Sequence, residues 1–306
     1  MIYLDNCATT KVSKEALDEM LPYFTEYYGN PESKYYEQAI KAKEAVKQSK
    51  YRISHFIGCD EDDIYFNSGS TEGNNTIIKG VADYYANKGN HIITTCVEHS
   101  SVIETCKYLE TKGFKVTYLP VDENCQINLN DLRNAITNNS ILVSIMWVNN
   151  EVGSIMPIKE IAKICNEKKI LFHSDATQAI GKIKINLNEI IGLSFITFSG
   201  HKIYGPKGIG CLISKKDSDG ISRRYTPLLH GGKQEDGFRA GTLNVPAIVG
   251  IGKACEMLEI SINKDLIRLQ VIEDKILSIL KEKYSDIIEI NNNFTKVAGI
   301  INIRFK

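Results

Sequence analysis

The feature that most constrains the fold of this chain is a regular alternation of short apolar segments with amphipathic ones between residues 63 and 213. Strands are predicted at residues 64–66, 91–95, 114–119, 141–148, 170–173, 195–198 and 210–213. Helices are predicted at residues 14–28, 34–57, 74–87, 100–111, 129–136 and 158–167. Strands that are apolar throughout are typical of a parallel sheet with both faces covered. We therefore predict an α/β fold with a mainly parallel sheet sandwiched by helices.

The C-terminal part of the chain has a different pattern. Helices are expected from just past Pro246 to about residue 260 and again at residues 266–283, and strands at residues 287–290 and 300–304. With 306 residues the chain is long enough for one large domain or two smaller ones. We predict a large unit of residues 14–252 and a partial small α/β unit of residues 1–13 with 253–306.

Charge and cysteine usage exclude several function classes. The chain has 37 basic and 37 acidic residues and no basic block, which argues against nucleic-acid binding. The N-terminus lacks signal-peptide features, and no apolar run reaches membrane-spanning length, so we expect a cytoplasmic protein that is not bound to a membrane. Eight cysteines occur without C-x-x-C or zinc spacing, so no metal site is predicted.

The end of the predicted strand at residues 195–198 carries three reactive side chains. Ser199, His201 and Lys202 follow it directly, before Gly and Pro residues turn the chain. A lysine in this place is either a desolvated amine, which is a nucleophile toward carbonyl groups, or a surface lysine beside a turn. The stretch alone leaves both readings open.

Other strand ends carry complementary groups. Ser70 and Thr71 lie in a Gly/Ser/Thr loop that opens a helix, which suits a phosphate or a simple N-cap. His99 either stacks on a planar ring and moves protons or is structural. Asn150 follows the strand at residues 141–148, and Asp175 follows the strand at residues 170–173.

Taken together, these groups match the needs of one cofactor. Ligands of open α/β sheets bind beyond the carboxyl ends of the strands. A phosphate cradle, a stacking imidazole, an amide, a carboxylate and an amine are the contacts that pyridoxal 5′-phosphate requires. The glycine patterns of nicotinamide enzymes and of P-loop ATPases are missing from the sequence. We therefore predict pyridoxal phosphate as the cofactor.

At this point the chain resembles a known family. It looks like a class V aminotransferase-fold enzyme of the NifS/IscS cysteine desulfurase type, which implies fold type I of the pyridoxal-phosphate-dependent transferases. The resemblance covers essentially the whole chain. The segments that carry it are residues 3–10, 29–31, 68–72, 98–99, 148–153, 175–178, 199–208, 230–232 and 239–242.

The resemblance implies a role for each matching residue. Lys202 is the Schiff-base lysine, and His99 stacks on the cofactor ring and helps to move protons. Asp175 pairs with the ring nitrogen, while Asn150 and Gln178 reach the phenolic oxygen. The phosphate is held by Ser70, Thr71, Ser199 and His201. Thr242 reaches the phosphate of a partner subunit, which implies a homodimer.

The implied activity is removal of sulfur from L-cysteine to give L-alanine and a persulfide. The sulfur passes to iron–sulfur cluster or thiolation pathways, through a possible sulfur-acceptor scaffold protein. The resemblance also implies that the persulfide cysteine and a substrate-binding arginine lie beyond Lys306, so we expect poor turnover by this chain. Cys7 is interpreted as structural. Tyr36, Ala39 and Asp236 depart from the family pattern.

Two alternatives stay open at this stage. In one alternative, instead of a cysteine desulfurase, the chain is a catalytically impaired, cofactor-binding homologue that acts as a dimerising scaffold. In the other alternative, it is another enzyme of the same fold, such as a transaminase or a lyase.

Overall fold

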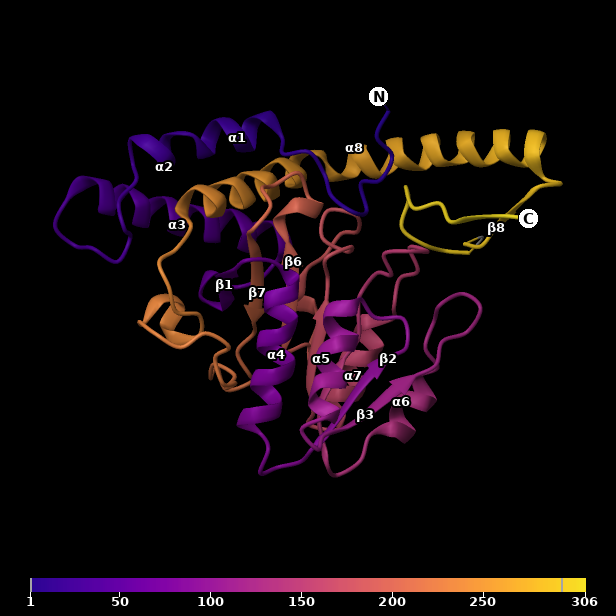
Figure 1. Ribbon diagram of the computed structural model, residues 1–306, viewed down its shortest axis with the longest axis horizontal. Helices are drawn as coiled ribbons and strands as arrows, with labels where there is room; N and C mark the ends of the chain where they lie inside the picture. Colours follow the sequence, from indigo (N-terminus) through magenta and orange to yellow (C-terminus); the bar gives the residue numbers. More distant parts are fainter. Residues whose placement is uncertain (1, 293) are drawn as a thin grey trace.

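The computed structural model describes residues 2–292 and 294–306, which form one central sheet with helices around it (Figure 1). The seven strands lie in the order β1-β7-β6-β5-β4-β2-β3. They are β1 (Ile64–Asn67), β2 (His91–Thr95), β3 (Lys115–Leu119), β4 (Ser140–Ser144), β5 (Leu171–Asp175), β6 (Phe195–Ser199) and β7 (Gly210–Ser214). Neighbours from β3 to β6 pair in parallel, and β7 pairs antiparallel with both β6 and β1. The predicted mainly parallel sheet is confirmed.

The helices alternate with the strands along much of the chain. They are α1 (Lys14–Met20), α2 (Pro22–Thr25), α3 (Glu37–Ile57), α4 (Ser70–Tyr84), α5 (Ser100–Glu110), α6 (Leu129–Ala135), α7 (Ile158–Glu167) and α8 (Val245–Tyr284). Short 3₁₀ turns lie at η1 (Glu61–Asp63), η2 (Leu187–Glu189), η3 (Gly200–Lys202) and η4 (Gln234–Gly237). Among the described residues, no helix is long and apolar enough to cross a membrane.

Both faces of the sheet are buried, which explains why its strands are apolar throughout. Successive strand residues point to opposite faces. In β2, Ile92 packs in a cluster with side chains of α4 and α5, and Ile93 packs in a second cluster with side chains of α3, α7 and α8. In β6, Phe195 and Ile196 divide between the same two clusters. Because both faces are covered by helices, the inner strands have no solvent-facing side on which polar residues would alternate with apolar ones.

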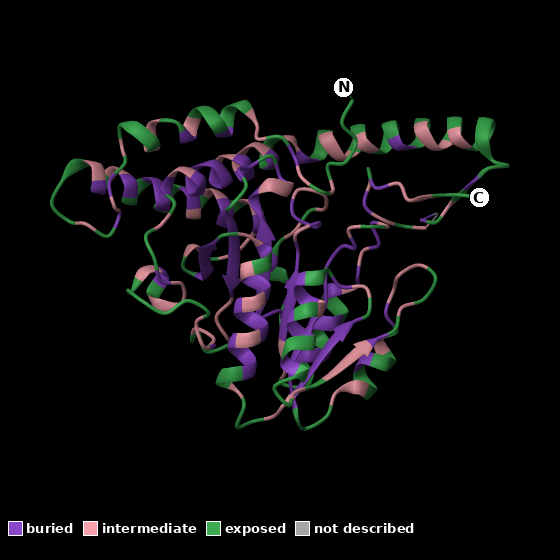
Figure 2. Cartoon of the chain, in the orientation of Figure 1, coloured by how far each residue is buried: buried purple, intermediate pink, exposed green. Residues whose placement is uncertain are grey.

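The long helix α8 corrects the prediction of two helices separated near residue 263. It is one continuous helix of 40 residues. Between residues 260 and 266 the chain has Ser and Asn but neither Gly nor Pro, so nothing there breaks the backbone hydrogen bonding. The first half of α8 is largely buried, whereas side chains of the second half such as Ile267 and Val271 are exposed (Figure 2).

Smaller differences from the prediction have local causes. The helix expected at residues 14–28 is divided into α1 and α2, because Pro22 begins a new helix. Strand β4 ends at Ser144 instead of continuing to residue 148, although the backbone of Ile145 and Trp147 still bonds to the neighbouring strand β5.

A two-stranded antiparallel sheet follows α8, formed by β8 (Ile288–Ile290) and β9 (Ile303–Phe305). The segment between these strands crosses back to the main sheet. Val297 N donates to Gly153 O at 3.0 Å, and Asn302 Nδ2 donates to Glu151 O at 3.1 Å. This contact places residues 299–302 beside the carboxyl edge of the large sheet. The division of the chain at residue 252 stays a prediction, and α8 runs across it.

Candidate active site

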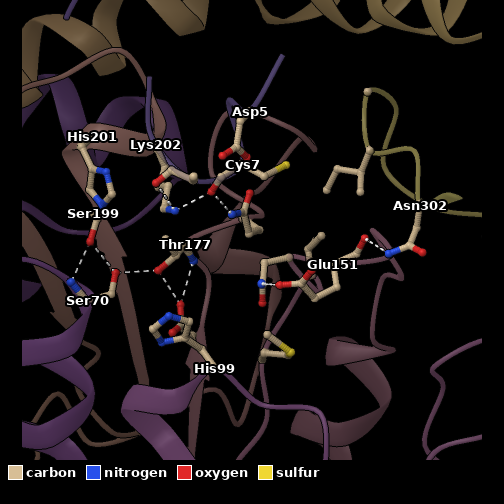
Figure 3. A pocket seen from close by; sticks show the side chains of 18 of the residues that line it. Asp5, Cys7, Ser70, His99, Glu151, Thr177, Ser199, His201, Lys202 and Asn302 are labelled. Carbon is tan, nitrogen blue, oxygen red and sulfur yellow. Dashed lines mark hydrogen bonds between the residues drawn. The ribbon is translucent and has the colours of Figure 1, made fainter. Parts of the chain in front are cut away.

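Lys202 lies in the turn that follows the buried strand β6. Its Nζ donates hydrogen bonds to the backbone carbonyl of Cys7 at 2.5 Å and to that of Ala8 at 2.7 Å (Figure 3). Burial lowers the pKa of this amine, while Cys7, Asp175 and Asp5 act in the opposite direction. A lowered pKa increases the fraction of neutral, nucleophilic amine at a given pH.

The N-terminal segment holds the lysine turn in place. Thr10 is buried, and its backbone N and its Oγ1 both donate to His201 O, at 2.8 and 2.9 Å. The same hydroxyl accepts from Tyr204 N at 2.8 Å. Tyr204 has a positive φ of 65°, a conformation that side chains rarely adopt unless their surroundings impose it. The sequence marked this segment as a motif but did not reveal the contact.

Asp175 is the last residue of β5 and is buried at the edge of the sheet. Its Oδ2 accepts from Asn74 Nδ2 at 2.7 Å. Its Oδ1 accepts from Thr177 N at 3.0 Å and from Thr177 Oγ1 at 2.5 Å. These three donors satisfy the need of a buried carboxylate for hydrogen-bond partners and fix its orientation.

Three hydroxyl groups meet at the N-terminus of α4. Ser199 Oγ accepts from Ser70 N at 2.7 Å and lies 2.8 Å from Ser70 Oγ, which in turn lies 2.5 Å from Thr177 Oγ1 (Figure 3). Gly69 precedes α4 with a φ of 141°, and a Cβ there would stand 3.2 Å from Ser199 Oγ. Free backbone N–H groups and hydroxyls at a helix N-terminus form an anion site.

His99 caps α5 with its side chain. Its Nδ1 accepts from Ser101 N at 3.2 Å and lies 2.8 Å from Ser101 Oγ. That hydroxyl accepts from Asn74 Nδ2 at 2.8 Å, so its own proton is free to go to His99 Nδ1. Neutral His99 therefore carries its proton on Nε2.

Sequence reasoning missed Asn74, a fully buried residue of α4. Its Nδ2 bonds both Asp175 and Ser101, and its Oδ1 accepts from Thr197 Oγ1 at 2.5 Å. A polar amide facing the apolar side of a helix was the signal that could have identified it, because such a group needs partners when buried.

The sequence marks residues 98–99 as a motif, but it does not show that Glu98 supports the loop that carries His99. Its carboxylate accepts from Met146 N at 2.9 Å and from Thr95 Oγ1 at 2.8 Å. Burial raises the pKa of Glu98 to about 8, against the effect of these hydrogen bonds. The contacts tie the loop that carries His99 to the chain beyond β4.

Gln178 and Asn150 contribute side-chain amides to the same edge of the sheet. Gln178 Nε2 donates to Cys7 O at 2.9 Å, and Asn150 Nδ2 donates to Glu151 Oε1 at 2.6 Å. All predicted site residues except Thr242 line one cavity of about 650 Å³. Residues 299–302 close one side of this cavity, which sequence reasoning did not foresee.

Thr242 is exposed and lies outside the cavity. Its loop is anchored to α4 through Arg239, whose Nε lies 2.9 Å from Glu72 Oε1.

Three residues depart from the pattern of the resembled family. Asp236, where that family commonly has a basic residue, adopts a left-handed conformation with φ 54° in η4. Tyr36 caps α3 and Ala39 is buried in that helix, and nothing in the structure explains these two departures.

Comparison with known proteins gives the family. Residues 2–306 match the family described as aminotransferase class-V. The chain is 44% identical over 304 residues to a protein of Rickettsia massiliae (strain Mtu5) named cysteine desulfurase IscS. The match covers 99% of this chain and 73% of that protein. A Rickettsia prowazekii (strain Madrid E) protein of the same name is also 44% identical, with the same coverage.

Solved structures agree with the sequence comparison. One described as a NifS-like protein superposes with a TM-score of 0.93 at 36% identity, covering 99% of this chain and 81% of that one. Another, described as SspA in complex with cysteine, superposes with a TM-score of 0.88 at 34% identity, covering 100% of this chain and 84% of that one. The chain therefore belongs to the class-V aminotransferase family.

Proposed function

We propose that this chain binds pyridoxal 5′-phosphate and acts as a cysteine desulfurase, which removes sulfur from L-cysteine and leaves L-alanine. One observation carries the proposal: Lys202, Asp175 and the hydroxyls of Ser70 and Ser199 meet in a single cavity of about 650 Å³. The names of the relatives and the cysteine complex of a similar structure support the substrate.

The residues of the cavity fit the cofactor. Lys202 Nζ would hold it covalently, and Asp175 would bind its ring nitrogen. The N-terminus of α4, with Ser70, Thr71, Ser199 and His201, would hold the phosphate, because hydroxyls and helix N–H groups suit an anion. When bound, the cofactor supplies an electron-accepting ring.

The remaining residues either move protons or orient the groups that bind the cofactor. His99, with its Nδ1 occupied by Ser101, presents Nε2 as the atom that gives or takes a proton and offers its ring for stacking. Asn150 and Gln178 carry amides that would bind the phenolic oxygen. The Asn74 amide orients two of these groups at once. It donates to the Asp175 carboxylate and to the Ser101 hydroxyl, which sets the tautomer of His99.

Titration of the purified protein with pyridoxal phosphate tests the cofactor. We expect a visible absorption band that survives gel filtration in the wild type and is lost in Lys202→Ala. A protein that stays colourless after incubation would overturn the assignment. Formation of alanine from L-cysteine, compared with other L-amino acids at equal concentration, then tests the substrate; equal or greater conversion of another amino acid by transamination or elimination would contradict desulfuration.

The proposal extends to partners and compartment. The exposed position of Thr242 outside its own cavity supports a homodimer in which it reaches the phosphate of the partner subunit. A single species of twice the chain mass in light scattering would support the dimer, and a monomer at micromolar concentration would contradict it.

The sulfur would pass to a scaffold protein of iron–sulfur cluster assembly or to a thiolation pathway. All eight cysteines are free thiols, which suits the reducing cytoplasm.

A further inference from the structure

Lys182 is a partly buried lysine in the turn that follows β5, four residues after Gln178. Its Nζ donates to Gln178 Oε1 at 2.6 Å. Burial, against the opposite effect of Cys7 and with a smaller contribution from Lys202, lowers the pKa of Lys182 to about 8. Among the described residues, no carboxylate lies within ion-pair distance of this amine. Taking an amine partly out of water without an acidic partner costs stability, so a lysine in this place points to a role.

The contacts of Gln178 define which way its amide points. The protonated Lys182 Nζ can only donate, and the Cys7 carbonyl can only accept. Gln178 therefore places Oε1 against Lys182 and Nε2 against Cys7 O, at 2.6 and 2.9 Å. The reversed amide would set a donor against a donor and an acceptor against an acceptor, which is unfavourable at both ends.

The backbone carbonyl of Cys7 is shared with the reactive amine. It accepts from both Gln178 Nε2 and Lys202 Nζ. Lys182 also lines a second cavity of about 400 Å³ that adjoins the first, and Cys7 and Lys202 line both. Lys182, Gln178, the Cys7 carbonyl and Lys202 thus form one hydrogen-bonded chain, with an amine at each end.

We propose that Lys182 is a positioning residue that holds the Gln178 amide with Nε2 as the donor facing the site. The identity of the oxygen that Nε2 then meets, the phenolic oxygen of pyridoxal phosphate, rests on the proposed function. The orientation itself rests on the contacts of this chain alone. Lys182 acts through Gln178, because Lys182 itself does not line the cavity of about 650 Å³.

Side-chain hydrogen exchange of Gln178 tests the orientation without any cofactor. In protein labelled at glutamine side chains, we expect Lys182→Met to speed exchange of the Gln178 amide hydrogens by about tenfold, because the bond that Lys182 donates to Oε1 no longer opposes rotation of the amide, and Nε2 then leaves Cys7 O more often. The exposed Lys184, changed to Met, is the matched control and should leave the rate unchanged. Unchanged Gln178 exchange in a folded Lys182→Met protein would overturn the proposal; the melting temperature establishes folding.

A thermodynamic cycle tests the consequence for the bound cofactor. The change Lys182→Met should weaken pyridoxal phosphate binding by about tenfold when Gln178 is present. It should have little effect in the Gln178→Ala background, because the residue that it orients is gone. An equal loss in both backgrounds would contradict the positioning role. A wild type that binds no cofactor would instead overturn the proposed function, and the exchange comparison would still decide the role of Lys182.

Discussion

Asn74 donates a 2.7 Å hydrogen bond to Asp175, from a residue 101 positions earlier in the chain. The bond joins α4 to the end of β5 across the carboxyl edge of the sheet. The second proton of the same amide goes to Ser101, which orients His99. One buried side chain thus serves both the carboxylate and the imidazole of the candidate site.

Replacing Asn74 by Leu should therefore destabilise the fold and the site together. The change leaves Asp175 Oδ2 without its donor and removes the bond of Thr197 Oγ1 to Asn74, and we expect a loss of about 2–4 kcal/mol in the free energy of unfolding. Urea denaturation measures it. Asn75→Leu is the matched control, because Asn75 Nδ2 bonds only the exposed carbonyl of Thr71 and should cost less than about 1 kcal/mol. Equal losses in the two variants would show that the hydrogen bonds of Asn74 add no more to the free energy of unfolding than a surface hydrogen bond does.

Thr10→Val should loosen the lysine turn. The valine keeps the shape but removes the hydroxyl that bridges His201 O and Tyr204 N, so the backbone N–H of Tyr204 loses its acceptor. We expect a loss of about 1–3 kcal/mol in the free energy of unfolding and weaker pyridoxal phosphate binding. Thr111→Val, at the exposed end of α5, is the control. Cofactor affinity that stays at the wild-type level would mean that the N-terminal segment does not hold the turn.

The ion pair between Glu72 and Arg239 predicts a pH dependence of stability. Burial by itself raises the pKa of Glu72, but hydrogen bonds from Arg239 and Ser68 outweigh it and lower the pKa below the ordinary value of 4.5. Because the folded-state pKa is the lower one, the pair stabilises the protein fully above pH 4.5. This contribution disappears as the pH falls through the folded-state value.

Glu72→Gln should therefore flatten the acid limb of the stability curve. The difference in free energy of unfolding between wild type and variant should be about 1–3 kcal/mol at pH 7 and should shrink toward pH 3. Chemical denaturation at several pH values measures it. Glu110→Gln, at an exposed carboxylate of α5, serves as the control. A difference that grows on acidification would reverse the assigned sign.

Cys7 should behave as a slow thiol although it lines the cavity. Burial raises its pKa, against the lowering effect of Lys182 and Lys202, so less of it is thiolate at neutral pH. We expect iodoacetamide at pH 7.5 to label the exposed Cys96 before Cys7, as peptide mass mapping would show. Cys7→Ala should also keep its cofactor band. Faster labelling of Cys7 than of Cys96 would contradict the structural interpretation of this residue.

The strand ends were predictable because the signal is local. Lys202 and Asp175 each follow a short apolar segment, and the carboxyl ends of parallel strands meet at one edge of a sheet. The structure accordingly brings both side chains to one cavity, together with His99. The continuity of α8 was not predictable with the same ease, since the exposed apolar residues of its second half gave an irregular pattern around residue 263.

The amino-acid sequence by itself determined the alternation of strands and helices, the parallel sheet and the reactive groups at its edge. Each depends on apolar spacing or on residue type within a few positions. Only the tertiary structure decided that Asn74 joins Asp175 to His99, that Gln178 is held by Lys182, and that the carbonyl of Cys7 meets Lys202. Most of these hydrogen bonds join distant segments, and all of them need packed side chains, because a buried polar group takes whichever partner the packing brings within reach.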